Sequence, residues 1–346
     1  QFVYNGQFGF SSSISSNGNT ISIGAPLQNN NRGQAYVFEN IGGSWTQIGQ
    51  DIEGVCCPVM ALGYSVSLNA DASILAVGCP KRHGSGFESG QVQVYEYSSS
   101  SWIQIGQNIN GESAGDKSGE SVSLSSNGNI VAIGAKYNSE NGQYSGHVRI
   151  YENISNIWTQ IGQDIDGESS NDYSGSSVSL SNDGSKLSIG TPYYGDGYVR
   201  IYENISGIWV QDGQDFSGIY RRYGHSTDLS GNGNTVVIGI PGYVPYSYDW
   251  NRGCVTIYSL MDNCPCYDTT LSISSCDSYI WDGVTYDSTG MYTNIYTGFN
   301  GCDSTVTLDL TINYSSFNIL SISSCTSFEW DGITYDSSGI YTNIYT

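Results

Sequence analysis

The sequence predicts an all-β protein, with a five-bladed β-propeller over residues 1–262 and small β-sandwich repeats after it. The composition favours strands and turns, with 44 Gly and 28 Tyr among 346 residues. The stretch FGFSSSISSNGN, which begins at Phe8, recurs with variation from Leu62, Ser118, Ser174 and Tyr223, at spacings of 54, 56, 56 and 49 residues. Repeats of this length that read as short strands are typical of propeller blades.

Each unit is predicted to contain four antiparallel strands, and the third unit shows the pattern most clearly. In its first strand, Val122 and Leu124 alternate with serines, as expected of a half-buried strand. The pair Asn127-Gly128 follows, which is typical of a type I′ hairpin turn. Residues 130–133 are continuously apolar, as in a strand that is covered on both faces.

The third strand of this unit carries Val148 and Ile150, and a tryptophan marks the fourth strand. The tryptophans that mark the fourth strands of units one to four are Trp45, Trp102, Trp158 and Trp209. Unit five has no such strand, but residues 2–7 resemble the Trp-x-Gln-Ile-Gly-Gln segment that precedes the next unit. We therefore expect the N-terminal strand to complete blade five and close the ring. The alternative is an open or larger ring whose other blades lie outside this chain.

The motifs Phe8-Gly9-Phe10-Ser11 and Ile23-Gly24-Ala25-Pro26 resemble the FG-GAP repeats of integrin-α-like propellers. They resemble the repeat proteins of secreted bacterial and microalgal surface layers more closely. The integrin-type repeat often carries an Asp-rich calcium loop between its first two strands. Here the matching segments, such as 126–129, are bare hairpins with too few oxygen ligands, so the resemblance does not imply calcium at these places.

The C-terminal part contains a second repeat, after a predicted linker at 263–269. The stretch that begins at Leu271 returns at Leu320, which predicts one repeat over 270–317 and a partial copy over 318–346. These copies resemble short immunoglobulin-like repeats near the C-termini of secreted Bacteroidota-type proteins. We expect the natural chain to continue beyond Thr346.

Nine cysteines indicate an oxidising, extracellular setting. The pairings that we expect are Cys276 with Cys302, Cys56 or Cys57 with Cys79, and Cys254 with Cys264 or Cys266, and of the alternatives we favour Cys57 and Cys264. The partner of Cys325 would then lie beyond this sequence. The spacing Cys264-Pro265-Cys266 is too short for a usual zinc site, so disulfides are favoured over metal.

The charge of the chain limits its partners. A net charge of −21 argues against nucleic acid and anionic membranes, and no apolar run is long enough to span a bilayer. The histidines His83, His147 and His225 occupy variable repeat positions, and no catalytic motif is present. We therefore expect no enzyme activity, no cofactor and no metal site.

Loops that join strands two to three, and strand four to the next blade, are long and variable, as binding loops on a rigid scaffold often are. In blade three these loops are 136–146 and 163–173. The residues predicted to form a partner or ligand face are Arg82, Arg221, Arg222, Tyr246 and Trp250. Asp164, Asp166, Glu168 and Asp172 lie among them, and ordinary solvated loops are the plain alternative.

Three sequons indicate N-glycosylation, at Asn153, Asn204 and Asn313, although chance sequons are expected in a chain rich in Asn and Ser. Asp287-Ser288-Thr289 and Asp303-Ser304-Thr305 resemble sites of O-glycosylation in Bacteroidota. The sequence favours a secreted structural protein that forms a homopolymer through contacts between propeller and tail repeats. The alternative is a lectin or adhesin that binds glycans on the long-loop face.

Overall fold

The computed structural model describes residues 6–54, 60–192, 196–243, 252–260, 269–281, 283–297, 303–314 and 321–342. These residues belong to two compact units, 6–260 and 269–342. The predicted propeller boundary at residue 262, and most of the predicted linker, lie outside the described ranges and stay predictions. No helix within the described residues is long and apolar enough to cross a membrane.

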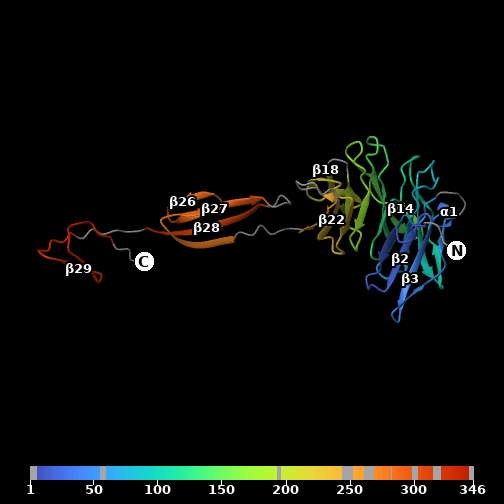
Figure 1. Ribbon diagram of the computed structural model, residues 1–346. Helices are drawn as coiled ribbons and strands as arrows, with labels where there is room; N and C mark the ends of the chain where they lie inside the picture. The colour runs from blue at the N-terminus through green and yellow to red at the C-terminus, as the bar shows by residue number, and fades with distance from the viewer. Residues whose placement is uncertain are drawn as a thin grey trace. The chain divides into compact units, whose positions relative to one another are not determined.

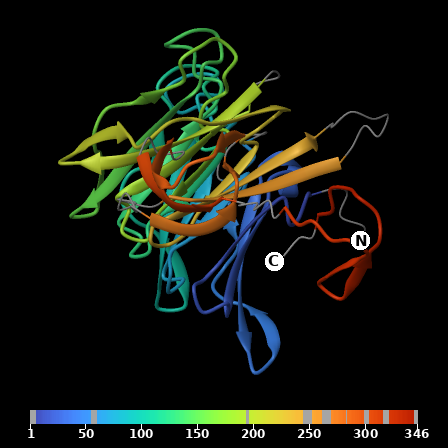
Figure 2. The ribbon, with the colours of Figure 1, turned by 90° about the vertical axis from the view of Figure 1, so that its left-hand side faces the viewer.

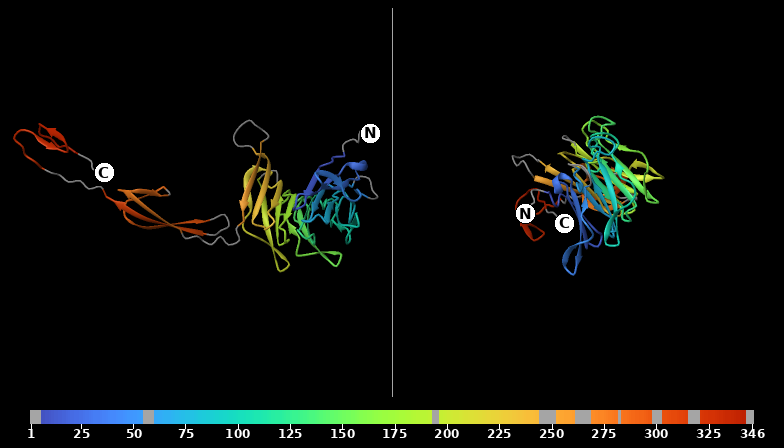
Figure 3. Two further views of the ribbon diagram at one scale, coloured as in Figure 1. Left: turned by 90° about the horizontal axis from the view of Figure 1, so that it is seen from below. Right: turned by 90° about the vertical axis from the view of Figure 1, so that its right-hand side faces the viewer.

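The first unit consists of five antiparallel sheets that follow one another in chain order, here called blades one to five (Figures 1 and 3). Blade one holds β1 (Ser11–Ile14), β2 (Thr20–Ala25), β3 (Gln34–Ile41), β4 (Ser44–Gln47) and β5 (Ile52–Glu53), with the short helix α1 (Gln28–Asn31) between β2 and β3. Blade two holds β6 (Ser65–Leu68), β7 (Ile74–Gly78), β8 (Gln91–Ser98), β9 (Ser101–Gln104) and β10 (Ile109–Asn110).

The remaining blades repeat this order. Blade three holds β11 (Ser121–Leu124), β12 (Ile130–Ala135), β13 (His147–Ile154), β14 (Ile157–Gln160) and β15 (Ile165–Asp166). Blade four holds β16 (Ser177–Leu180), β17 (Lys186–Thr191), β18 (Asp196–Ile205), β19 (Ile208–Gln211) and β20 (Phe216–Arg221). Blade five holds β21 (Ser226–Leu229), β22 (Thr235–Tyr243) and β23 (Arg252–Ser259).

Blades one to four each contain five strands, so the predicted count of four is wrong by one. The extra strand has two residues in blades one to three and six in blade four. It pairs with the first residues of the third strand, while the fourth strand pairs with the last residues of the third strand. In blade three, Val148 pairs with Ile165 and Ile154 pairs with Ile157. The third strand is long enough to hold both partners on one edge. The four tryptophans lie on the fourth strands, as predicted.

The hairpin between the first two strands also differs from the prediction. In a type I′ turn both central residues have positive φ. Here Gly128 has φ 72° but Asn127 is not among the positive-φ residues. The Asn127 side-chain oxygen instead accepts hydrogen bonds from Ser125 Oγ at 2.8 Å and from the Asn129 amide at 2.9 Å. This local Asx-type bonding holds Asn127 in the ordinary backbone region and leaves the left-handed position to Gly128.

Successive blades pack face to face, and each interface uses the same two surfaces. The first, called here the leading face, is formed in blade three by Val148 and Ile150 of β13, both fully buried. They pack against the receiving face of blade four, which is formed by its first two strands and its fourth-strand tryptophan, Trp209. Equivalent clusters join blades one and two, two and three, and four and five. In Figure 2 the colour of successive blades changes from blue through green to yellow.

Serines of the first strands connect consecutive blades by hydrogen bonds. Ser123 Oγ accepts from the Leu180 amide of the next blade at 3.0 Å, and Ser121 Oγ donates to the Gly175 carbonyl at 2.8 Å. Ser67 and Ser65 make the same two bonds one interface earlier. The alternation of serine with apolar residues therefore reflects contacts between blades rather than exposure to solvent.

Blade one and blade five each have one face that no other blade covers. On the receiving face of blade one, Ile14 is 61% exposed and Trp45 48%, whereas their blade-three counterparts Leu124 and Trp158 are 8% and 3% exposed. On the leading face of blade five, Val255 is 64% exposed and Ile257 68% exposed. These two faces therefore do not cover each other in this structure.

The predicted ring closure rests largely on residues 1–5, which lie outside the described residues, and it stays a prediction. Of the two described residues of that segment, Gly6 lies against blade one itself, because its carbonyl accepts from the Leu27 amide at 3.2 Å. Within the described residues, β23 pairs only with β22.

The second unit is a small β-structure. It contains β24 (Thr269–Cys276), β25 (Tyr279–Trp281), β26 (Val284–Tyr286), β27 (Gly290–Thr297), β28 (Asp303–Asn313), β29 (Phe328–Trp330) and β30 (Ile333–Tyr335). The central strand β28 runs parallel to β24 and antiparallel to β27. Among the described residues of this unit, Leu308, Leu310 and Ile312 form the buried core, and a few partly buried residues pack around them. The second copy contributes one hairpin, β29–β30.

Candidate functional site

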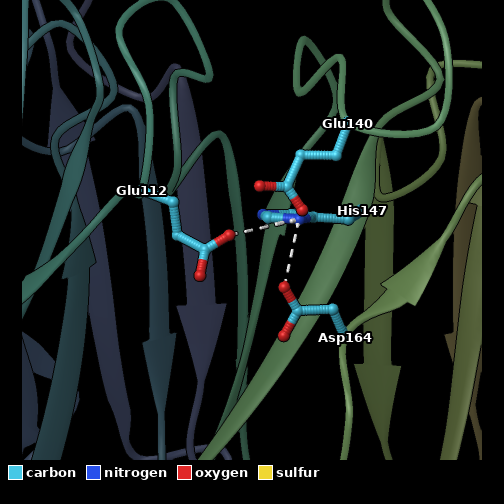
Figure 4. Close-up of side chains that lie close together, drawn as sticks. All are labelled: Glu112, Glu140, His147 and Asp164. Carbon is cyan, nitrogen blue, oxygen red and sulfur yellow. Dashed lines mark ion pairs between the residues drawn. The ribbon is translucent and has the colours of Figure 1, made fainter.

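Blade three carries a group of polar side chains at the end of its sheet where the long loops lie. His147 is the first residue of β13, and Glu140 belongs to the loop before it. Asp164 lies between β14 and β15, and Glu112 comes from the connection between blades two and three. One ligand atom from each of the four residues lies within 4.8 Å of all the others (Figure 4).

His147 is fully buried, and neither of its ring nitrogens makes a hydrogen bond. Its Nδ1 lies 3.7 Å from Asp164 Oδ2, 4.0 Å from Glu112 Oε2 and 3.9 Å from Asp166 Oδ1. The backbone brings Asp166 there, because it pairs with His147 across β13 and β15. The imidazole is therefore surrounded by carboxylates but is too distant from them for hydrogen bonding.

Neighbouring groups hold two of the carboxylates in place. Glu112 Oε1 pairs with Arg149 at 3.1 Å, which leaves Oε2 toward His147. Asp164 Oδ1 accepts from Gln160 Nε2 at 2.6 Å, which leaves Oδ2 toward the same ring (Figure 4). Such outer contacts orient ligand groups in metal sites.

Burial and the neighbouring charges shift the protonation of this group. Burial, helped by the positive charge of Arg149 and opposed by Asp164, lowers the pKa of His147 to about 4. The imidazole is therefore neutral near pH 7. Burial raises the pKa of Glu112, and Arg149 opposes that rise. Burial, together with Asp164 and Glu140, also raises the pKa of Asp166.

A cavity of about 540 Å³ lies next to this group and shares Glu140 with it. Lys117, Tyr137 and Tyr144 also line the cavity. Tyr144 stacks on Tyr173 with ring centroids 6.0 Å apart, and Lys117 Nζ lies 4.7 Å from the centroid of the Tyr137 ring. The cavity therefore offers aromatic surfaces, a cation and a carboxylate at one place on the long-loop side of blade three.

The sequence predicted that the long loops 136–146 and 163–173 would form a partner face, and both contribute residues to this region. It does not predict the cluster, because His147 occupies a variable repeat position and the sequence predicts no metal site. The four residues are spread over 53 positions, from 112 to 164, and none forms a short motif with another. The only local signal was a histidine that begins a strand between two acidic loops.

Of the other residues predicted for the partner face, the structure describes the side chains of Arg82 and Arg222, and neither joins this group. Arg82 is partly buried in blade two, where its Nη1 lies 3.3 Å from Met60 Sδ. Arg222 is exposed between blades four and five. The side chain of Arg221, and all of Tyr246 and Trp250, lie outside the described residues.

The predicted disulfides stay predictions. Cys79, Cys254, Cys276 and Cys325 are free thiols in this structure. Their expected partners Cys57, Cys264 and Cys302 lie outside the described residues. Cys79 is buried and donates to the Met60 carbonyl at 3.3 Å, and burial raises the pKa of its thiol to about 12.

The sequon asparagines of blades three and four occupy matching hairpin tips. Asn153 Oδ1 accepts from the Asn156 amide at 2.8 Å, and Asn204 Oδ1 accepts from the Gly207 amide at 2.7 Å. These bonds explain why asparagine recurs at the tip whether or not a glycan is attached. Asn313 is exposed at the end of β28. Glycosylation at the three positions stays a prediction.

No family model matches the sequence, and no curated protein is similar to it. Solved structures with similar folds include hydrazine synthase of Kuenenia stuttgartiensis, with 14% identity, a TM-score of 0.49, and 74% of this chain and 64% of that chain covered. TolB of Acinetobacter baumannii matches with 16% identity, a TM-score of 0.44, and 72% and 51% covered. The Dos1 propeller matches with 12% identity, a TM-score of 0.41, and 66% and 51% covered. This chain thus spans between half and two thirds of the length of these three proteins.

The expectation that the chain is not an enzyme is corrected by these comparisons. One of the similar structures is, by its name, an enzyme, hydrazine synthase. At 14% identity the likeness assigns no activity to this chain.

Proposed function

We propose that the chain is an extracellular structural protein whose copies associate head to tail through their end blades. In this arrangement the leading face of blade five in one copy covers the receiving face of blade one in the next. The observation that supports the proposal is the pair of uncovered end faces, Val255 and Ile257 on one and Ile14 and Trp45 on the other. Four interfaces of this type already join the blades within the chain.

The same surfaces that are buried within the chain are thus available at its two ends. Large exposed apolar surfaces usually mark interaction sites. A head-to-tail contact of unlike faces generates rings or open filaments, depending on whether the rotation closes. The nine cysteines and the matched sequons favour an extracellular location.

The proposal also includes structural features that the sequence predicts. These features are FG-GAP-type repeats, five blades per chain, immunoglobulin-like tail repeats, and further contacts between tail and propeller. The competing arrangement is a five-bladed ring that closes within one chain through the N-terminal strand.

Two complementary variants test the association. We expect Ile14→Glu and Ile257→Glu each to weaken self-association of the full chain by roughly 100-fold, because each places a charge in the interface. Mixed in equal amounts, the two variants should form a heterodimer, since each retains the face that the other has lost. Light scattering after size-exclusion chromatography measures these masses. Ile205→Glu, at a hairpin tip where Ile205 is 53% exposed, should behave like the unaltered chain.

A mixture that stays monomeric would contradict the head-to-tail contact. So would an unaltered chain that is monomeric at all concentrations, with slow hydrogen exchange in both β1 and β23. That second result would indicate closure of the ring within one chain.

A carbohydrate-binding function is a second candidate, favoured by the cavity beside Tyr137 and Tyr144. Exposed tyrosines on a rigid scaffold can stack on sugar rings, while Lys117 and Glu140 can bind hydroxyl groups. We expect Tyr144→Ala to reduce binding on a glycan array at least about tenfold, because stacking and apolar burial are lost together. Tyr314→Ala, which removes a 66% exposed tyrosine in the second unit, should leave binding unchanged. An array without any bound glycan would exclude this function.

A further inference from the structure

His147 occupies a position that is occupied in the other blades by a side chain with a hydrogen-bond partner. In blade one this residue is Gln34, whose Nε2 donates to Glu53 at 2.7 Å. In blade two Gln91 Nε2 donates to Asn110 Oδ1 at 2.6 Å, and in blade four Tyr198 OH donates to Asp172 at 2.8 Å. Only in blade three, among these four, does the side chain reach acidic neighbours without bonding to any of them.

The balance of charge also separates blade three from blade four. In blade four, Arg200 pairs with Asp215 and Glu168 at 2.7 and 2.9 Å, so that both carboxylates bind one cation. In blade three, Arg149 pairs with Glu112 alone among the described residues. Asp164, Asp166 and Glu140 lie near His147, and no side chain in the described part of the chain provides them with a cation of their own.

We propose that Glu112, Glu140, His147 and Asp164 bind one divalent first-row transition ion, with Zn²⁺ and Mn²⁺ as its representatives. The donor set contains one imidazole nitrogen and three carboxylate oxygens, all within 4.8 Å of one another. Metal–ligand bonds of about 2.0–2.2 Å place the ligands of one ion roughly 3–4 Å apart, so a small contraction of exposed side chains completes the site. Nitrogen favours transition ions over Ca²⁺, which prefers six to eight oxygen ligands.

The surroundings support the same assignment. His147 is fully buried and fixed at the start of a strand, while Glu112 and Glu140 reach the site from loops. Arg149 and Gln160 hold Glu112 and Asp164 by their outer oxygens and leave the inner oxygens toward the ring. Because the connection between blades two and three supplies Glu112, a bound ion would link the two blades as well as the long loops.

Calorimetric titration of the full chain, after treatment with a chelator, tests the proposal. With ZnCl2 and MnCl2 as separate probes, we expect one tight equivalent per chain and an increase in Tm. Glu140→Gln should weaken this binding by roughly tenfold or more. Glu140 is exposed, so this variant should fold normally. Glu96→Gln changes the charge equally at an exposed position of β8 outside the site, and it should bind like the unaltered chain.

A spectroscopic measurement identifies the nitrogen ligand. Pulsed electron paramagnetic resonance of the Mn²⁺-loaded chain should show one imidazole nitrogen, which His147→Gln removes. Weak uptake at many places, equal in Glu140→Gln and Glu96→Gln, would overturn the proposal, because it would reflect only the net charge of −21. Displacement of Zn²⁺ by equimolar Ca²⁺, or the absence of any binding, would also overturn it.

Discussion

Replacing Gly134 with alanine is expected to destabilise the first unit by about 2–3 kcal/mol or more. Gly134 lies in β12, where an added Cβ would meet the Gly175 carbonyl of the next blade well inside contact distance. The obstacle is backbone at the interface between blades three and four, so it cannot rotate away. Urea denaturation followed by tryptophan fluorescence would measure the loss in the free energy of unfolding.

Gly239→Ala is the matched control, because Gly239 is the counterpart of Gly134 in blade five. There the three atoms nearest to an added Cβ all belong to the exposed residue Ser226, and the nearest is its hydroxyl oxygen, which can turn away. At concentrations where the chain is monomeric, we expect Gly239→Ala to change stability by less than about 1 kcal/mol. Equal losses for the two variants would contradict the uncovered end face and indicate that blade five is covered within a single chain.

Truncating Trp158 to alanine is expected to cost about 3–5 kcal/mol, the usual range for a large buried aromatic residue. Trp158 is 3% exposed and fills the receiving face of blade three. Its indole donates to the Ile105 carbonyl of the previous blade at 3.1 Å. The Gln107 side chain bonds to both its amide and its carbonyl, at 3.0 and 2.6 Å.

Trp45→Ala makes the same chemical change on the uncovered face of blade one. Because Trp45 is 48% exposed and has no preceding blade against it, we expect a loss of about 1 kcal/mol or less. Thermal unfolding of the two variants under identical conditions would compare them. Similar decreases in Tm would show that a partner surface covers Trp45 in solution.

The repeating pattern determined most of the architecture. Its spacing located the blades, and the alternation around Val148 and Ile150 predicted the third strand, because these patterns follow directly from side-chain periodicity. The sequence does not predict the fifth strand of blades one to three, because two residues such as Ile165 and Asp166 carry no detectable periodicity. The hairpin at Asn127 differs from the predicted type I′ turn because Asn-Gly fits more than one turn type, and the side-chain hydrogen bonds of Asn127 decide between them.

The candidate metal site was not predictable in this way. Its four residues lie on three connections and one strand, and each of them is unremarkable within its own segment. In the sequence, an acidic loop that supplies ligands cannot be distinguished from an ordinary solvated loop. The buried imidazole beside these loops becomes evident only in the folded structure. Comparison of His147 with its counterparts Gln34, Gln91 and Tyr198 becomes informative only when the hydrogen bonds of all four side chains are known.

Patterns along the chain are sufficient to predict a series of repeated β-sheet units, followed by one shorter repeat and a partial copy of it. Which faces of those sheets are covered does not follow from these patterns, because burial depends on the neighbouring blade. The folded structure shows Ile14 and Ile257 uncovered on the two end blades, and it places His147 among carboxylates from blade three and from the connection between blades two and three.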